Sequence, residues 1–239
     1  MKQMRFGELS AVVTGGTDRE GGGDGPIVVL MHGFGAPGTD LVPLWRVLDA
    51  PPGTRFVFPA APHVLDFGFG DARAWWMIDM MAYERAIRTG TARVIADGVP
   101  DGLPEARTLL TAALTDIVAK MGPSPLYLGG FSQGAMLAMD VALHTELPLA
   151  GVALLSGSLV ARDEWIPRMP ARRGLRIMQS HGHADTVLPF TLAEELRDLL
   201  VAAGTSHRFV PFRGGHEIPP EVTDALGDLL RGETPPSLA

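Results

Sequence analysis

One short segment constrains the fold more than any other. Gly130-Phe131-Ser132-Gln133-Gly134 fits the pattern G-x-S-x-G, and it lies between an apolar run at 125–130 and a helical run at 135–144. A serine in this setting predicts a sharp strand–turn–helix, with its hydroxyl at the carboxyl edge of a sheet. The two glycines are needed because a Cβ so close to a strained turn would clash. The following helix would place its partial positive charge where an oxyanion could form.

Short apolar runs alternate with helical patterns from residue 27 onward. Continuous apolar runs of this length are typical of strands buried on both faces, and the intervening helices are the crossovers that parallel pairing requires. We therefore predict an α/β fold with a mostly parallel central sheet covered by helices on both faces. The expected strands are 27–31, 55–58, 125–130, 149–155, 175–180 and 207–212.

Helix boundaries follow from particular residues. Apolar residues at helical spacing predict a helix over 103–118. Thr191 and Glu194 have the spacing of a capping box and predict the start of another helix. Pro220 suits the first turn of the last helix, and Gly232 suits its end.

Two segments interrupt the alternation. Residues 15–25 are rich in glycine, neither follow an expected strand nor open a helix, and are expected to form a flexible surface loop. Residues 59–102 contain no clear strand and are too long for a simple connection. We expect a single domain over 1–239, in which residues 63–102 form a lid-like or pocket-forming excursion.

Composition limits the possible partners. With 20 Lys+Arg against 27 Asp+Glu, the net charge is −7, which argues against nucleic-acid binding. The absence of cysteine excludes thiolate nucleophiles and cysteine-ligated zinc. No apolar stretch is long enough to span a membrane, and no signal peptide is apparent, so we expect a cytoplasmic protein.

A base and an acid that would activate Ser132 follow the last two expected strands. Asp185 lies in the loop after 175–180, and His216 lies in a glycine-flanked loop after 207–212. The chain order Ser, Asp, His predicts that His216 takes the serine proton while Asp185 orients the imidazole. His32 follows an early strand and suits a structural hydrogen bond instead.

Metal chemistry is not expected. His181 and His183 are two residues apart, but no third ligand is evident.

The small residues of His32-Gly33-Phe34-Gly35 let the backbone turn an N–H toward a developing negative charge. The backbone N–H groups of Phe34 and Gln133 are therefore the predicted oxyanion donors.

Together these segments resemble the phospholipase/carboxylesterase family of the α/β-hydrolase superfamily, which includes acyl-protein thioesterases. The resemblance implies catalytic Ser132, Asp185 and His216, oxyanion donors Phe34 and Gln133, and neither a metal nor an organic cofactor. Ala36 replaces an acidic residue that the family often has. The stretches that carry the resemblance are LMHGFGAPGTD (30–40), FPAAP (58–62), RAWW (73–76), LGGFSQGAMLAMDVAL (128–143), LLSG (154–157), HGHADTVLP (181–189) and GGHEIP (214–219).

The stretch that begins at Trp75, Trp76 and Met77 has two interpretations. These side chains line an acyl or aromatic pocket beside Ser132, or the tryptophans anchor the segment to the core while methionines fill gaps. As a surface, the same segment would also suit a homodimer contact.

The expected function is that of a serine carboxylesterase, which hydrolyses small-molecule carboxylic esters through an acyl-enzyme on Ser132. An acyl-thioesterase or a lysophospholipase would use the same triad and remains an alternative. A non-catalytic binding protein on the same fold is a further one.

Overall fold

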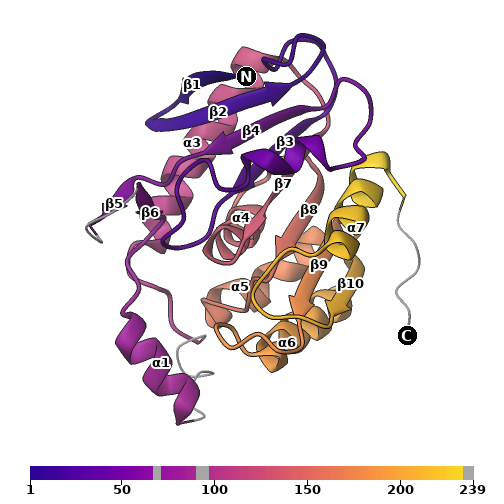
Figure 1. Cartoon of the computed structure of the whole chain (residues 1–239). Helices are drawn as coiled ribbons and strands as arrows, with labels where there is room; N and C mark the ends of the chain where they lie inside the picture. Colours follow the sequence, from indigo (N-terminus) through magenta and orange to yellow (C-terminus); the bar gives the residue numbers. More distant parts are fainter. Residues whose placement is uncertain (67–70, 90–96, 234–239) are drawn as a thin grey trace.

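The fold is known from a computed structural model, which describes residues 1–66, 71–89 and 97–233. A twisted eight-stranded sheet runs through the molecule in the order β1-β2-β4-β3-β7-β8-β9-β10 (Figure 1). Its strands are β1 (Lys2–Phe6), β2 (Leu9–Gly15), β3 (Ile27–Met31), β4 (Arg55–Pro59), β7 (Leu126–Phe131), β8 (Leu149–Leu155), β9 (Arg176–Gly182) and β10 (Ser206–Phe212).

The six strands expected from the sequence are β4, β3, β7, β8, β9 and β10, and each pairs in parallel with its neighbour. Parallel pairing brings their carboxyl ends to one edge of the sheet. Met31 pairs with Gly130, and Gly130 pairs in turn with Leu154. The loops that follow β3, β7 and β8 therefore begin side by side.

Helices cover both faces of the sheet, which confirms the predicted fold class. The helices are α1 (Met80–Arg88), α3 (Leu103–Met121), α4 (Gln133–His144), α5 (Arg162–Arg168), α6 (Phe190–Ala202) and α7 (Pro220–Arg231), with short 3₁₀ turns at Val42–Arg46 and Met169–Arg172. Ile27, Val29 and Met31 of β3 pack into the core cluster with α3, α4 and α6, whereas Val28 and Leu30 pack into the cluster with α7. This division explains why β3 has no polar position.

The ends of these helices test the boundary predictions. The last helix begins at Pro220 and stops at Gly232, which has φ 84°, as expected. The capping box at Thr191 is wrong, because α6 already begins at Phe190 and its N-cap position is Pro189. No helix within the described ranges is long and apolar enough to cross a membrane.

Four strands were not expected from the sequence. β1 and β2 form an antiparallel hairpin that pairs with β4 and extends the sheet beyond the parallel strands. β5 (His63–Leu65) and β6 (Ala72–Ala74) form a second hairpin inside the segment predicted to lack strands. Three-residue strands leave too short an alternation to be recognised in a sequence.

The glycine-rich loop at 15–25 is closed by hydrogen bonds, which corrects the expectation of a flexible loop. The N–H of Thr17 donates to the carbonyl of Gly22, and the carboxylate of Asp18 accepts from the N–H groups of Glu20 and Gly22. The buried guanidinium of Arg55 then donates to Gly25 O, which fastens the loop to the start of β4.

Candidate active site

Ser132 stands at a sharp turn between β7 and α4. Its backbone has φ 54° and ψ −118°, a strained conformation for a residue with a side chain, and its N–H donates to Leu155 O at 2.8 Å. A Cβ on Gly130 would lie 2.6 Å from Met31 O, and one on Gly134 would lie 2.2 Å from the same oxygen. Both glycines are therefore required by the close approach of β3 to the turn.

Asp185 and His216 form a direct pair between two loops. Nδ1 of His216 donates to Oδ2 of Asp185 at 2.7 Å. The imidazole also packs against the ring of Phe131, with centroids 4.7 Å apart, so it lies beside the serine turn. An imidazole that donates through Nδ1 keeps Nε2 free to accept a proton.

The other carboxylate oxygen of Asp185 is fixed by the backbone. Oδ1 accepts hydrogen bonds from the N–H groups of Val187 and Leu188, both at 2.8 Å. Burial raises the pKa of Asp185, but the hydrogen bonds from His216, Leu188 and Val187 outweigh it, so the pKa lies below its ordinary value. The carboxylate is thus held ionised and oriented toward the imidazole.

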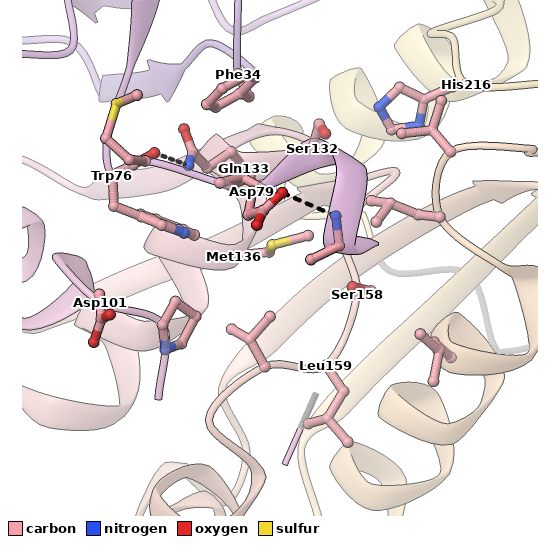
Figure 2. A pocket seen from close by; sticks show the side chains of 18 residues that line it. Phe34, Trp76, Asp79, Asp101, Ser132, Gln133, Met136, Ser158, Leu159 and His216 are labelled. Carbon is pink, nitrogen blue, oxygen red and sulfur yellow. Dashed lines mark hydrogen bonds between the residues drawn. The ribbon is translucent and has the colours of Figure 1, made fainter. Parts of the chain in front are cut away.

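Ser132 and His216 line the same cavity and lie at the same end of it (Figure 2). Among the hydrogen bonds of the described residues, none joins the two side chains. Catalytic hydrogen bonds of this kind are often long in the absence of a ligand and tighten when substrate binds. The structure therefore places Ser132 and His216 on one cavity, with Asp185 bonded to His216.

The predicted oxyanion donors flank Ser132. Phe34 and Gln133 both line the cavity, and within the described chain neither backbone N–H donates a hydrogen bond to the protein. The loop that carries Phe34 is braced by β6, because Gly35 N–H donates to Arg73 O at 2.8 Å and Arg73 N–H donates to Ala36 O at 3.1 Å. Two free N–H groups on rigid loops can stabilise negative charge on a substrate oxygen.

His32 has a structural role. Its Nδ1 donates to Gly33 O at 2.8 Å, and its Nε2 accepts from Ala61 N–H at 3.0 Å, so both ring nitrogens are engaged. Burial lowers the pKa of His32 and so favours the neutral ring that these bonds require. His32 shapes the loop that carries Phe34 and is not available as a base.

The side chain of Gln133 makes contacts that sequence reasoning missed. Its Oε1 accepts from Trp75 N–H at 2.9 Å, and its Nε2 donates to Trp76 O at 2.8 Å. Figure 2 shows the bond to Trp76 at the edge of the cavity. The residue that offers its backbone N–H to the cavity therefore also fixes one wall of it. No sequence pattern indicates that Gln133 bonds to Trp75 and Trp76, and the two hydrogen bonds are evident only from the structure.

Trp75, Trp76 and Met77 occupy different environments. Trp76 is buried and lines the cavity, and Met77, which is 59% exposed, lies on it as well. Trp75 is fully buried and does not line the cavity; its indole N–H donates to His32 O at 3.0 Å instead. The predicted substrate contact for Trp75 is thus replaced by an anchoring contact, because its indole points at the oxyanion loop.

The cavity has a volume of about 530 Å³ and is walled mainly by apolar side chains. Residues 76–79, 82 and 100–101 line it together with residues of the sheet edge and of α4. Two exposed carboxylates, those of Asp79 and Asp101, also line it, and Asp79 accepts a hydrogen bond from Ala82 N–H. A volume of this size suits a small organic ligand.

The described part of the chain contains no group of three His, Cys, Asp or Glu side chains that could hold a metal ion. His181, one of the two histidines considered for zinc, donates from Nε2 to Leu188 O at 2.8 Å. It therefore supports the same turn whose N–H groups hold Asp185.

A family model described as Phospholipase/Carboxylesterase matches residues 19–231. Acyl-protein thioesterase 1 of Neurospora crassa is 27% identical over 222 residues, which cover 87% of this chain and 86% of that protein. The crystal structure of esterase PE8 aligns with a TM-score of 0.76 at 30% identity, over 94% of this chain and 98% of the other. A phospholipase/carboxylesterase from Dyadobacter fermentans aligns with a TM-score of 0.69 at 18% identity, over 96% of this chain and 100% of the other, which shows the shared fold alone.

Proposed function

The chain belongs to the phospholipase/carboxylesterase family, and from this premise we propose that it is a serine carboxylesterase that works through an acyl-enzyme on Ser132. As a member of this family, it is a hydrolase that acts on ester bonds. The observation that carries the proposed acyl-enzyme mechanism is the 2.7 Å hydrogen bond between Asp185 and His216. His216 lines the same cavity as Ser132.

Acylation begins when Ser132 Oγ attacks the ester carbonyl carbon while His216 Nε2 takes the hydroxyl proton. The carbonyl π electrons move to the oxygen, and the N–H groups of Phe34 and Gln133 stabilise the resulting oxyanion. Asp185 stabilises the imidazolium through its bond to Nδ1. When the tetrahedral intermediate collapses, the bond to the alcohol oxygen breaks, and His216 gives its proton to that oxygen.

Deacylation repeats these steps with water as the nucleophile. His216 takes a proton from water, the hydroxide oxygen bonds to the acyl carbon, and the bond to Ser132 Oγ breaks. The proton returns from His216 to the serine, and the carboxylic acid leaves. His216 carries every proton in this scheme, while Asp185 and the two N–H donors stabilise the charges that form.

An acyl-thioesterase is the second candidate, because several similar proteins are acyl-protein thioesterases. The chemistry at Ser132 is identical for both substrates, and only the sulfur or oxygen leaving group differs. We expect kcat/KM for 4-nitrophenyl esters to exceed that for acyl thioesters of the same chain length. A strong preference for thioesters, after correction for their intrinsic reactivities, would assign the chain to the second candidate.

A fluorophosphonate probe tests the proposed nucleophile. The native protein should become labelled on Ser132, whereas Ser132→Ala and heat-denatured protein should remain unlabelled. The denatured sample shows that labelling depends on the assembled site and not on an exposed hydroxyl. Absence of label on the folded protein would favour a non-catalytic binding protein.

A further inference from the structure

Ser158 places a second hydroxyl on the cavity, three residues after the end of β8. Ser158 is only 3% exposed, and it contributes to the cavity wall. Figure 2 shows it between Met136 and Leu159 in that wall. Among the hydrogen bonds of the described residues, none involves its hydroxyl, which is open to the cavity. This serine has no part in the proposed triad or oxyanion hole.

The cavity wall that includes Ser158 is mainly apolar. Met136, Leu159, Leu188 and Leu192 line the cavity with it. The neutral polar side chain of Gln133, which also lines the cavity, is already bonded to the backbone of Trp75 and Trp76. Ser158 is therefore the polar group of the buried wall, among the described residues, whose hydrogen-bonding capacity remains available to a ligand.

The hydroxyl of Ser158 faces the cavity, and a substrate that fills the cavity shields it from water. A hydroxyl that is shielded in this way and finds no partner is unfavourable, because it gives up its hydrogen bonds to water. A ligand atom that accepts a hydrogen bond at this place restores what was lost. A ligand with only hydrocarbon there leaves the hydroxyl unpaired. Sites built in this way discriminate against analogues that lack the polar group.

We propose that Ser158 is a specificity-determining residue that donates a hydrogen bond to an acceptor oxygen on the acyl group of the substrate. The inference rests on the proposed function, in which the acyl group remains bonded to Ser132 while the alcohol departs. The acyl group is present in both acylation and deacylation, and it is the part of the substrate that lies against the buried wall. The substrate class is then oxygen-bearing acyl esters, such as oxoacyl esters, in preference to plain alkanoyl esters of equal length.

A series of matched substrates tests this assignment. The 4-nitrophenyl esters of heptanoic, 4-oxoheptanoic, 5-oxoheptanoic and 6-oxoheptanoic acids differ only in the presence and position of one carbonyl oxygen. For each ester, kcat/KM is divided by the rate of hydroxide-catalysed hydrolysis to remove intrinsic reactivity. The native enzyme should favour at least one oxo ester over the heptanoate by about 2- to 10-fold, the effect of one neutral hydrogen bond.

Variants identify the hydroxyl responsible for that preference. Ser158→Ala should bring the ratio of oxo ester to heptanoate close to one, and Ser158→Thr, which keeps a hydroxyl, should retain part of it. Ser180→Ala is the matched control, because Ser180 is a buried serine whose hydroxyl has no partner among the described residues, and it does not line the cavity. Its ratio should equal that of the native enzyme. Ser158→Cys has nearly the native volume and serves if the alanine variant does not fold.

Two results would overturn the assignment: a native enzyme with no preference for any oxo ester, or a preference that survives in both Ser158→Ala and Ser158→Cys. A chain that hydrolyses none of these esters, including the heptanoate, contradicts the proposed function itself and the inference with it. The heptanoate rate therefore distinguishes the two failures.

Discussion

The indole Nε1 of Trp75 donates a hydrogen bond of 3.0 Å to the backbone carbonyl oxygen of His32. Their rings also lie close together, with centroids 5.6 Å apart. This contact joins the segment after β6 to the loop after β3. Because Gln133 binds the backbone of Trp75 as well, the serine turn, the oxyanion loop and the cavity wall form one hydrogen-bonded unit.

Trp75→Phe removes the indole donor and leaves most of the ring volume in place. The buried carbonyl of His32 then lacks this partner, which should lower the free energy of unfolding by about 1–3 kcal/mol. We also expect kcat to fall, because the loop that carries Phe34 loses an anchor. Steady-state kinetics and urea denaturation measure the two effects.

Trp165→Phe provides the matched control for this change. Trp165 is also fully buried, and its indole donates to Asp140 Oδ1 at 2.8 Å, but it does not line the cavity. The Trp165→Phe variant should have a lower free energy of unfolding but nearly the native kcat. Equal losses of kcat in the two variants would contradict a specific role of Trp75 in the oxyanion loop.

Gln133→Met keeps the backbone N–H of residue 133 but removes both side-chain hydrogen bonds to the tryptophan segment. We expect kcat to fall about 10- to 100-fold, because small displacements of a catalytic loop are costly. Gln179→Met is its control, since Gln179 is a buried glutamine bonded to His207 and Ala193 away from the cavity. If both variants keep the native kcat, the side chain of Gln133 does not position the site.

Asp185→Asn tests how His216 is oriented. The amide oxygen can still accept from Val187 and Leu188, so the turn should persist, but the amide N–H₂ would favour the tautomer with Nε2 protonated. We expect kcat to fall about 10³- to 10⁴-fold, as in other triads of this kind. A loss smaller than 10-fold, with an unchanged circular dichroism spectrum, would show that Asp185 does not fix the tautomer.

His207 should make stability depend on pH. Burial and, to a lesser extent, the nearby Arg197 lower its pKa to about 4 from 6.5, and its Nε2 donates to Gln179 Oε1. Between pH 6.5 and 4, the unfolded chain binds a proton that the folded protein does not, so the free energy of unfolding falls as the pH falls through this range. At about 1.4 kcal/mol for each pKa unit, the full loss is about 3 kcal/mol.

His207→Gln isolates this contribution from other titrating groups. The glutamine amide can donate to Gln179 but does not titrate. Urea denaturation at pH 7.5 and pH 4.5 should therefore show a smaller loss of stability in the variant than in the native protein. Identical losses in the two proteins would contradict the assignment to His207.

The parallel core of the fold could be predicted from the sequence because its signals are local. A strand such as Ile27–Met31 is apolar throughout since it is covered on both faces, and the glycines around Ser132 mark a turn that admits no other residue. The chain order of Ser132, Asp185 and His216 then follows from the order in which strands supply loops to one sheet edge.

The features that sequence analysis missed depend on contacts between distant segments. β1 is an edge strand with exposed positions, so its pattern carries little hydrophobic signal. Nothing near Gln133 in the sequence indicates that its side chain binds Trp75 and Trp76. The same is true of Ser158, whose significance comes from its place in the cavity wall and the lack of a partner there.

The most direct test of the central claim is mass spectrometry of the acyl-enzyme. The native protein is mixed with a 4-nitrophenyl ester and quenched in acid within the first turnovers, and the intact mass and the peptide that contains residue 132 are measured. The account predicts a mass increase equal to the acyl group less the hydrogen that it replaces, located on Ser132 and absent from Ser132→Ala. Turnover of the ester without an adduct on Ser132, or undiminished turnover by Ser132→Ala, would contradict it.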